Sequence, residues 1–380
     1  MKGQRCEQPE IALIICVLYD LSSDILRDGY MTEISSLLEK LSNAHGISGR
    51  EGSVRDIVRE ELSGLVDDVR TDVLGNLIGT RHGDRPSIMV EAHMDEIGLM
   101  VKYVDENGFL RFIRIGGWFD QTLLNQRVII HAPTGAITGV IGCKPPHVMK
   151  EEDRKKVIEA TDMFIDIGCQ SDKDARELGI VPGLPITIDR NFATLKGDRV
   201  TGKAFDNRAG IVMMIEALKR TKSKSTIYCV GTVQEEVGLK GAKTSAYGLN
   251  PDLAIASDVT IPGDHPGIEK KDSPLEMGKG PVVTVADASG RGIIATPEVV
   301  SWLVETAKEF GIDIQLDVAE GGTTDGTAIH LTRSGIPTGV LSVATRYIHS
   351  PVEVLSLTDI DKGADLIARA METAPKYFKV

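Results

Sequence analysis

At 380 residues the chain is long for a single hydrophobic core, so we expect two domains. Hydrophobic residues make up 42% of the sequence and charged residues 26%, which is ordinary for a globular protein. The 55 acidic residues outnumber the 43 basic ones and give a formal net charge of −12, which repels polyanions, so we expect neither nucleic acid nor an anionic membrane surface as a partner.

The first thirty residues differ from the rest of the chain. The apolar run 11–18 is too short to span a bilayer, and no small-residue cleavage site of a signal peptide follows it. We predict that residues 1–30 are an N-terminal extension and that Met31 is the more natural start. A docked amphipathic helix over the extension is the alternative.

The chain from residue 31 to residue 97 begins a globular pattern. Apolar residues at helical spacing predict helices over 33–46 and 51–66. Short apolar runs then predict strands near residues 69–73, 77–80 and 87–92.

The predicted secondary structure changes between residues 98 and 192. This stretch reads as short strands and turns with little helix, and Asn107-Gly108 is typical of a hairpin turn. It predicts a small β-barrel or sandwich inserted in a larger domain.

Beyond residue 200, helices and strands alternate. Helices are predicted over residues 207–221, 297–310, 325–333 and 359–377, and strands over residues 226–233, 253–257, 282–286, 312–318 and 338–344. We therefore predict an α/β fold, a three-layer α/β/α sandwich with a largely parallel mixed sheet, plus the inserted barrel-like domain. Residues 31–97 and 197–380 would form the discontinuous larger domain, and residues 98–196 the insert.

Cysteine usage indicates the compartment. The five cysteines are an odd number, and no spacing among them is typical of a zinc site or a disulfide framework. Cys143, Cys169 and Cys229 lie in apolar stretches, where a free cysteine behaves as a small hydrophobic residue. We predict a reducing compartment, the cytoplasm.

Two adjacent glutamates, Glu235 and Glu236, follow the predicted strand 226–233. Successive side chains along a strand point in different directions. One carboxylate can therefore hold a metal while the other moves a proton. Taken alone, the pair would be two solvated glutamates in a loop, and it gains weight because other predicted strands also end in metal-ligand residue types.

His93 and Asp95 stand at the end of the predicted strand 87–92. Residues two apart on a strand share a face. Asp95 can then accept the free ring N–H of His93 and fix the tautomer of a metal ligand. A surface histidine with a nearby acid is the plainer interpretation of this pair by itself.

Three further residues complete the candidate set. Asp206 precedes the predicted helix 207–221, where an aspartate is more often an N-cap but can also bridge two cations. Asp258 ends a predicted strand, and His349 follows another; singly, both are common turn and loop residues.

The joint occurrence of these residues is more informative than any one of them. In open α/β sheets, ligand sites gather outside the carboxyl ends of strands. Two imidazoles and three carboxylates, without a thiolate, suit zinc, cobalt or manganese at a hydrolytic two-metal centre. The predicted ligands are His93, Asp206, Glu236, Asp258 and His349.

Six stretches, taken in order, carry a resemblance to a known family. They are EAHMDE at 91–96, IGCKPPH at 141–147, VTGKAFDNRAG at 200–210, GTVQEEVG at 231–238, GGTTDG at 321–326 and RYIHSPVE at 346–353. From about residue 31 to its end, the chain resembles the deblocking, or tetrahedral, aminopeptidases. These are dinuclear metallopeptidases related to glutamyl aminopeptidases and formerly described as cellulases.

The resemblance implies how the ligands divide between two divalent metal ions, with zinc or cobalt preferred. His93 and Asp258 would hold one ion, and Glu236 and His349 the other. Asp206 would bridge the two.

The resemblance also implies an activity and an assembly. Glu235 would be the general base and Asp95 would orient His93, in an enzyme that removes N-terminal residues from short peptides. The inserted β domain would mediate dimerisation in a homo-oligomer, which in this family is commonly a tetrahedral dodecamer.

Other hydrolases and a non-catalytic assembly are the alternatives to an aminopeptidase. A carboxypeptidase or an acyl-amino-acid deacylase can share the metals and the base and differ only in the substrate pocket. A glycosidase needs two carboxyl groups about 5–10 Å apart across the bond, which adjacent glutamates do not obviously supply. A non-catalytic metal-binding assembly would leave Glu235 without a role.

Overall fold

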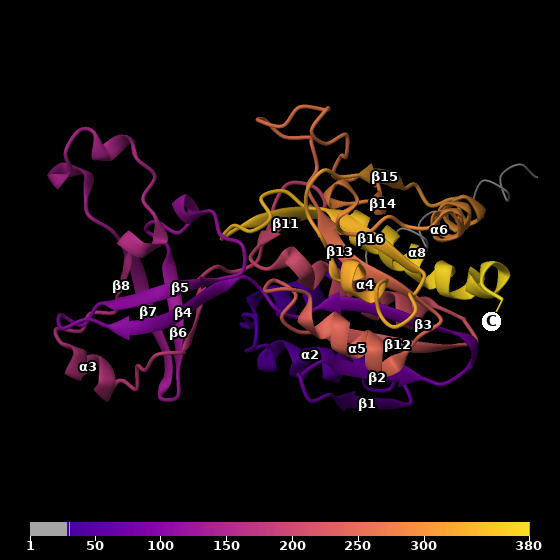
Figure 1. Cartoon of the computed structure of the whole chain (residues 1–380), viewed down its shortest axis with the longest axis horizontal. Helices are drawn as coiled ribbons and strands as arrows, with labels where there is room; N and C mark the ends of the chain where they lie inside the picture. The colour runs from indigo at the N-terminus through magenta and orange to yellow at the C-terminus, as the bar shows by residue number, and fades with distance from the viewer. Residues whose placement is uncertain (1–28, 30, 380) are drawn as a thin grey trace, which may run out of the picture.

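Figure 1 shows the computed structural model, which describes residue 29 and residues 31–379. The extension predicted for residues 1–30 therefore lies, residue 29 apart, outside the described residues. A helix over residues 31–43 precedes the elements that carry labels in the figure. Within the described chain, no helix is both long and apolar enough to cross a membrane. The described cysteines, Cys143, Cys169 and Cys229, are all free.

A mixed eight-stranded sheet forms the centre of the larger part of the molecule. Its strands lie in the order β1-β2-β12-β3-β13-β16-β14-β15, and β12, β3, β13 and β16 run parallel to one another. The strand bounds are β1 Asp68–Thr71, β2 Leu77–Arg81, β3 Asp84–His93, β12 Ser225–Thr232, β13 Leu253–Thr260, β14 Val282–Ala286, β15 Gln315–Val318 and β16 Thr338–Ala344. Parallel strands are buried on both faces, which explains their near-continuous apolar runs.

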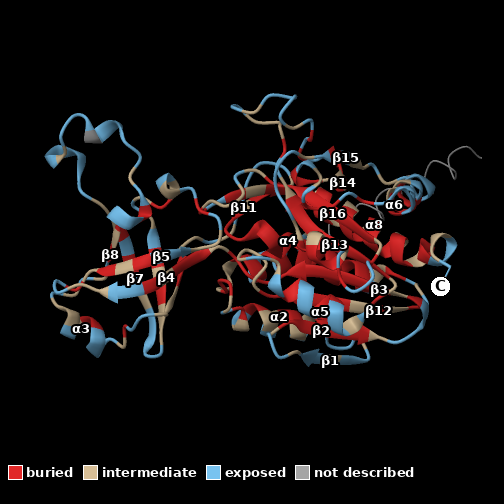
Figure 2. Ribbon diagram, in the orientation of Figure 1, coloured by how far each residue is buried: buried red, intermediate tan, exposed pale blue. Residues whose placement is uncertain are grey.

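Helices cover both faces of this sheet. Those on one face are α2 (Gly52–Leu62), α4 (Phe205–Arg220), α6 (Pro297–Phe310) and α8 (Leu357–Tyr377); those on the other are α5 (Lys240–Leu249) and α7 (Asp325–Ile329). Consecutive residues of β3 alternate between the two layers: Val90 belongs to the first apolar cluster and Met89 to the second. Figure 2 shows the buried residues concentrated in the sheet and α4. The predicted three-layer α/β/α architecture is confirmed.

The segment that follows β3, from residue 98 to residue 188, forms a closed antiparallel barrel, at the left of Figure 1. Its strands lie in the order β4-β5-β8-β7-β6-β9 around an apolar core of their own. The bounds are β4 Gly98–Val104, β5 Leu110–Ile115, β6 Arg127–Ala132, β7 Gly135–Gly142, β8 Phe164–Asp166 and β9 Pro185–Ile188, with the short helix α3 at Asp172–Glu177. The prediction left barrel and sandwich open, and the structure has a barrel.

Several elements differ from the prediction. Helix α5 and a small sheet of β10 (Ala193–Thr194), β11 (Arg199–Gly202) and β17 (Glu353–Ser356) were not predicted. The predicted end of the strand 253–257 at Asp258 was wrong: β13 continues to Thr260, because Asp258, Val259 and Thr260 all pair with β16. Asp258 is therefore fixed by the sheet ladder itself.

Candidate metal centre

The parallel strands deliver their acidic and imidazole side chains to one edge of the sheet. β12, β3 and β13 are neighbours, with β3 between the other two. His93 is the last residue of β3, Asp258 lies near the end of β13, and Glu235 and Glu236 follow β12. These side chains meet at the carboxyl edge of the sheet, where ligands of open α/β sheets bind.

Helix α4 brings Asp206 to the same place. Asp206 and Asn207 have non-helical backbone angles at its start. The cap is supplied by Asn207, whose Oδ1 accepts the N–H of Gly210 at 3.0 Å, while its amide donates to the carbonyl of Ser257 at 2.7 Å. Capping by Asn207 leaves the carboxylate of Asp206 free to face the other candidate ligands.

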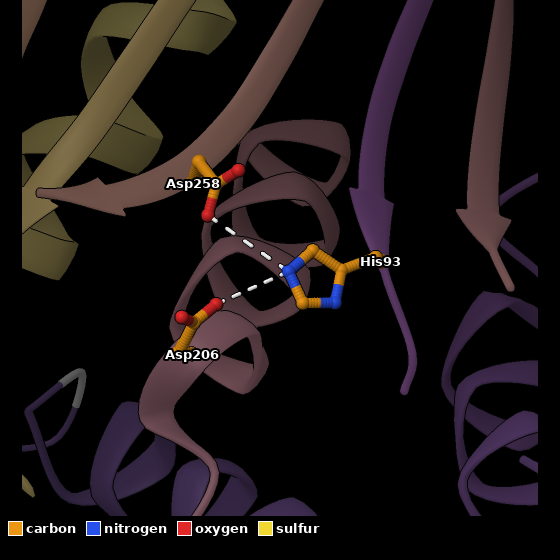
Figure 3. A group of neighbouring side chains, drawn as sticks. All are labelled: His93, Asp206 and Asp258. Carbon is orange, nitrogen blue, oxygen red and sulfur yellow. Dashed lines mark hydrogen bonds and ion pairs between the residues drawn. The ribbon is translucent and has the colours of Figure 1, made fainter. Parts of the chain in front are cut away.

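One group of candidate ligands lies on the Nε2 side of the ring of His93 (Figure 3). Its Nε2 lies 3.1 Å from Oδ1 of Asp206 and 4.0 Å from Oδ1 of Asp258. The three side chains offer donor atoms that all lie within 4.8 Å of one another. The ring is almost fully buried, at 2% side-chain exposure.

A second group surrounds His349, in the loop between β16 and β17. Its Nε2 lies 3.3 Å from Oδ2 of Asp206 and 3.2 Å from Oε2 of Glu236. These donors also lie within 4.8 Å of one another. The two groups share Asp206, which turns one oxygen to each. Asp206 thus has one carboxylate oxygen available to each group.

Glu235 stands beside the first group. Its Oε2 lies 3.8 Å from Nε2 of His93, and its side chain is 11% exposed. The structure thus brings together all seven of the predicted site residues.

Asp95 connects the two glutamates to His93. Its main-chain carbonyl lies 3.1 Å from Nδ1 of His93, and its carboxylate is 3.6 Å from the same nitrogen. The carboxylate accepts the N–H groups of Glu235 and Glu236 at 3.0 and 3.2 Å and the hydroxyl of Ser48 at 2.6 Å. Asp95 therefore fixes the loop after β12 as well as the ring of His93.

Sequence reasoning missed the buried groups behind Asp206. Glu353 accepts the N–H of Asp206 at 3.1 Å. It was not predicted as a site residue, although it lies within one of the motifs that carry the family resemblance. Lys203 donates to both oxygens of the buried Glu96, at 2.9 and 2.8 Å, and Arg208 lies 3.6 Å from Glu96. These contacts join the start of α4 to the loop after β3.

A buried acid pair behind Glu235 was also missed. The hydroxyl of Thr232 lies 3.0 Å from Oε1 of Glu91 and 2.6 Å from Oδ2 of Asp325. Both acids lie in motifs of the family resemblance, which was the available signal. Burial, followed by the charge of Asp325, raises the pKa of Glu91 well above its ordinary value.

Neighbouring charges within the site shift one another's pKa values. Burial alone would lower the pKa of His349, but hydrogen bonds to Asp206 and Glu236 raise it to about 11. Burial would also lower the pKa of His93, but the charge of Glu235 and the hydrogen bond to Asp206 raise it well above the ordinary range. Burial raises the pKa of Glu235 and that of Glu236. A buried acidic cluster of this kind is stabilised by positive charge.

The donor set fits divalent metal ions. The imidazole and carboxylate donors of both groups suit zinc, cobalt or manganese. The second carboxylate oxygen of Glu236, Oε1, is buried without a hydrogen-bond partner, which leaves a lone pair for a cation. His93, Asp206 and Asp258 would hold one ion, and Asp206, Glu236 and His349 the other.

Comparison with known proteins identifies the family of this chain. Residues 75–366 match the family described as M42 glutamyl aminopeptidase. The chain belongs to this family. It is 35% identical over 340 residues to the lysyl aminopeptidase of Pyrococcus furiosus, covering 88% of this chain and 96% of that protein.

Solved structures agree with this assignment. The aminopeptidase APDkam598 of the archaeon Desulfurococcus kamchatkensis is 44% identical with a TM-score of 0.88, covering 92% of this chain and 97% of that one. The TET1 peptidase of Pyrococcus horikoshii, which can assemble into a tetrahedron or a large octahedral shell, is 34% identical with a TM-score of 0.80, covering 91% and 100%. This M42 family member is a peptidase, and the resemblance inferred from its motifs is confirmed.

Proposed function

We propose that this M42 family member is a dinuclear metal-dependent aminopeptidase with Glu235 as its general base. The observation that carries the proposal is the placement of Asp206, with one oxygen toward His93 and Asp258 and the other toward His349 and Glu236. Glu235 also belongs to a third group of candidate donors, with His93 and Glu236, and we assign it the role of base because the two groups that share Asp206 already account for two ions.

The chemistry follows from this arrangement. Two bound divalent cations supply Lewis acidity and lower the pKa of a nucleophilic water. Glu235 accepts the proton of the attacking water and returns it to the leaving amine, acting as base and then as acid. Without bound ions, burial raises the pKa of Glu235 above that of a solvated glutamate.

The proposed substrates are short peptides with a free N-terminus. The curated relative named above is a lysyl aminopeptidase and the family is described as glutamyl aminopeptidase, so the preferred N-terminal residue differs between relatives. We further propose a cytoplasmic homo-oligomer, a tetrahedral dodecamer, with residues 98–196 as its dimerisation domain. The tetrahedron formed by the TET1 peptidase supports this assembly.

Replacement of the base tests the reaction. In Glu235→Gln we expect two bound metal equivalents and a kcat lower by about 10²–10⁴-fold, because the amide keeps the shape and cannot accept the proton. In Asp206→Ala we expect loss of metal as well as activity. Glu305→Gln, on the exposed side of α6, is the matched control and should keep both. Near-normal turnover in Glu235→Gln would remove Glu235 as the base.

A substrate panel tests the aminopeptidase assignment. Aminoacyl-nitroanilides, including lysyl and glutamyl forms, should be cleaved in the presence of zinc, cobalt or manganese and not after chelation. N-acetylated peptides should resist cleavage. Preferential release of a C-terminal residue or of an acyl group would instead show a carboxypeptidase or a deacylase on the same scaffold.

A further inference from the structure

A segment of the barrel lies directly against the second group of candidate ligands. Residues 116–119 connect β5 to a short 3₁₀ turn at Asp120–Thr122. An ideal Cβ built on Gly117 would lie only 2.9 Å from Nδ1 and 3.2 Å from Cε1 of His349. One built on Gly116 would lie 2.6 Å from Cγ2 of Ile97 and 3.3 Å from Oε2 of Glu236. The backbone of the barrel thus reaches the side chains that face Asp206.

The glycine at position 117 is required by space rather than by backbone conformation. Gly116 has a φ of 80°, which favours glycine for conformational reasons, whereas Gly117 does not lie in the left-handed region. The obstacle to a side chain at 117 is therefore the ring of His349, because a carbon 2.9 Å from a ring nitrogen forces one of them to move.

The segment is held in place by the barrel. Trp118 is buried, and its indole N–H donates to the carbonyl of Gly98 at 2.9 Å. Trp118 also lines one small pocket together with Asp206, Glu236 and His349. Farther along, Arg114 and Asp120 form an ion pair at 2.6 Å. The position of Gly117 against His349 therefore follows the position of the barrel.

The two ligand groups differ in how they are supported. His93, Asp206 and Asp258 all come from the α/β part of the molecule and are buried. His349 comes from a loop, and its side chain is 40% exposed. Gly117 lies against the Nδ1–Cε1 edge of the ring, whereas Nε2 faces Asp206 and Glu236.

We propose that Gly116 and Gly117 form the outer wall of the second metal position and hold His349 in its ligating orientation. The affinity of that position then depends on the seating of the barrel, and the first position does not. Gly117 is a positioning residue that acts through His349. This inference rests on the two-metal function proposed above, because it concerns which of the two ions is held less tightly.

Metal titration of side-chain substitutions at Gly117 tests the proposal. We expect Gly117→Ala to weaken one of the two metal equivalents by about 10–100-fold, as for other residues that orient ligands, and to leave the other unchanged. Gly117→Val should weaken the same equivalent further. The readout is the number and dissociation constant of bound cobalt ions in a stepwise titration, followed by absorption and by elemental analysis after dialysis.

A matched control and a second variant keep the proposal testable if the Gly117 variants misfold. Gly248→Ala, on the exposed face of α5 with no atom within 4 Å of the new Cβ, should bind both equivalents as the unaltered chain does. Trp118→Phe removes the hydrogen bond to Gly98 and leaves position 117 a glycine. It should weaken the same equivalent, and it decides the matter if the Gly117 variants do not fold.

The outcomes separate this inference from the proposed function. If the unaltered chain binds two equivalents and Gly117→Ala binds both with unchanged affinity, the wall is refuted and the two-metal function stands. Equal weakening of both equivalents also refutes it. If the unaltered chain binds fewer than two equivalents, both proposals fall.

Discussion

The replacement of Asp95 by asparagine gives the sharpest test of how the site is held. The carboxylate of Asp95 accepts three donors: the hydroxyl of Ser48 and the N–H groups of Glu235 and Glu236. Asparagine keeps the shape but has one acceptor oxygen, and its NH₂ must face one of the two main-chain N–H groups. The hydroxyl of Ser48 can rotate to accept from it, but an N–H group cannot.

One partly buried N–H is therefore left without an acceptor in either orientation of the new amide. Such a loss costs about 1–3 kcal/mol, so we expect the free energy of unfolding of Asp95→Asn to fall by that amount. The same loss releases the loop that carries Glu235. A displacement of roughly 1 Å in a catalytic group costs about 10²-fold in rate, and we expect kcat to fall by about that factor.

The assay pairs urea denaturation with peptide hydrolysis. Asp72→Asn is the matched control, in a turn between β1 and β2, because one oxygen of Asp72 accepts the N–H groups of Leu74, Gly75 and Asn76 and the other accepts the side-chain amide of Asn76 at 2.7 Å, a bond that an NH₂ group cannot accept. It should lose stability and keep the kcat of the folded enzyme. An Asp95→Asn enzyme with reduced stability and unaltered kcat would refute the positioning role of Asp95.

Three further predictions concern stability. Lys203→Met leaves the buried Glu96 without its closest cation, and we expect a loss of about 3–5 kcal/mol in urea denaturation; a loss below about 1 kcal/mol would contradict this. Burial, and then the charge of Lys203, lowers the pKa of His45 from 6.5 to about 4, so the unfolded chain takes up a proton first as the pH falls. Stability should drop between pH 6.5 and pH 4, and His45→Gln should flatten that drop; an unchanged slope would exclude His45 as its source. Adding zinc or cobalt to chelator-treated protein should raise the Tm. At a metal concentration one hundred times the Kd, the free energy of unfolding should increase by about 2.7 kcal/mol, and Asp206→Ala should abolish both changes.

Much of the candidate site was accessible from the sequence because its residues end strands. A buried parallel strand has a clear apolar signature, and the polar residues that follow it must emerge at the carboxyl edge of the sheet. This reasoning located His93, Glu235 and Glu236 without any knowledge of the fold. It misplaced Asp258 because a charged residue ordinarily ends an apolar run, whereas pairing with β16 continues the strand through it.

Contacts between distant segments were beyond sequence reasoning. Nothing local at Glu353 indicates that its carboxylate accepts the N–H of Asp206, and nothing local at Gly117 indicates a nearby imidazole. Helix α5 was missed because Gly241 and Gly248 lower its helix propensity, and packing against α7 and the sheet stabilises it instead. Tertiary packing decides such features, and one sequence does not display it.

The order of the strands has a consequence for synthesis of the chain. Because β3 lies between β12 and β13, the ligands nearest to one another in space leave the ribosome at widely separated times, with His93 early and His349 close to the end. A nascent or truncated polypeptide can thus carry the first imidazole and still lack the partners that would retain an ion beside it. If the chain holds two ions as proposed, ion loading would be a late event, and the peptidase would stay inert until its translation had passed His349.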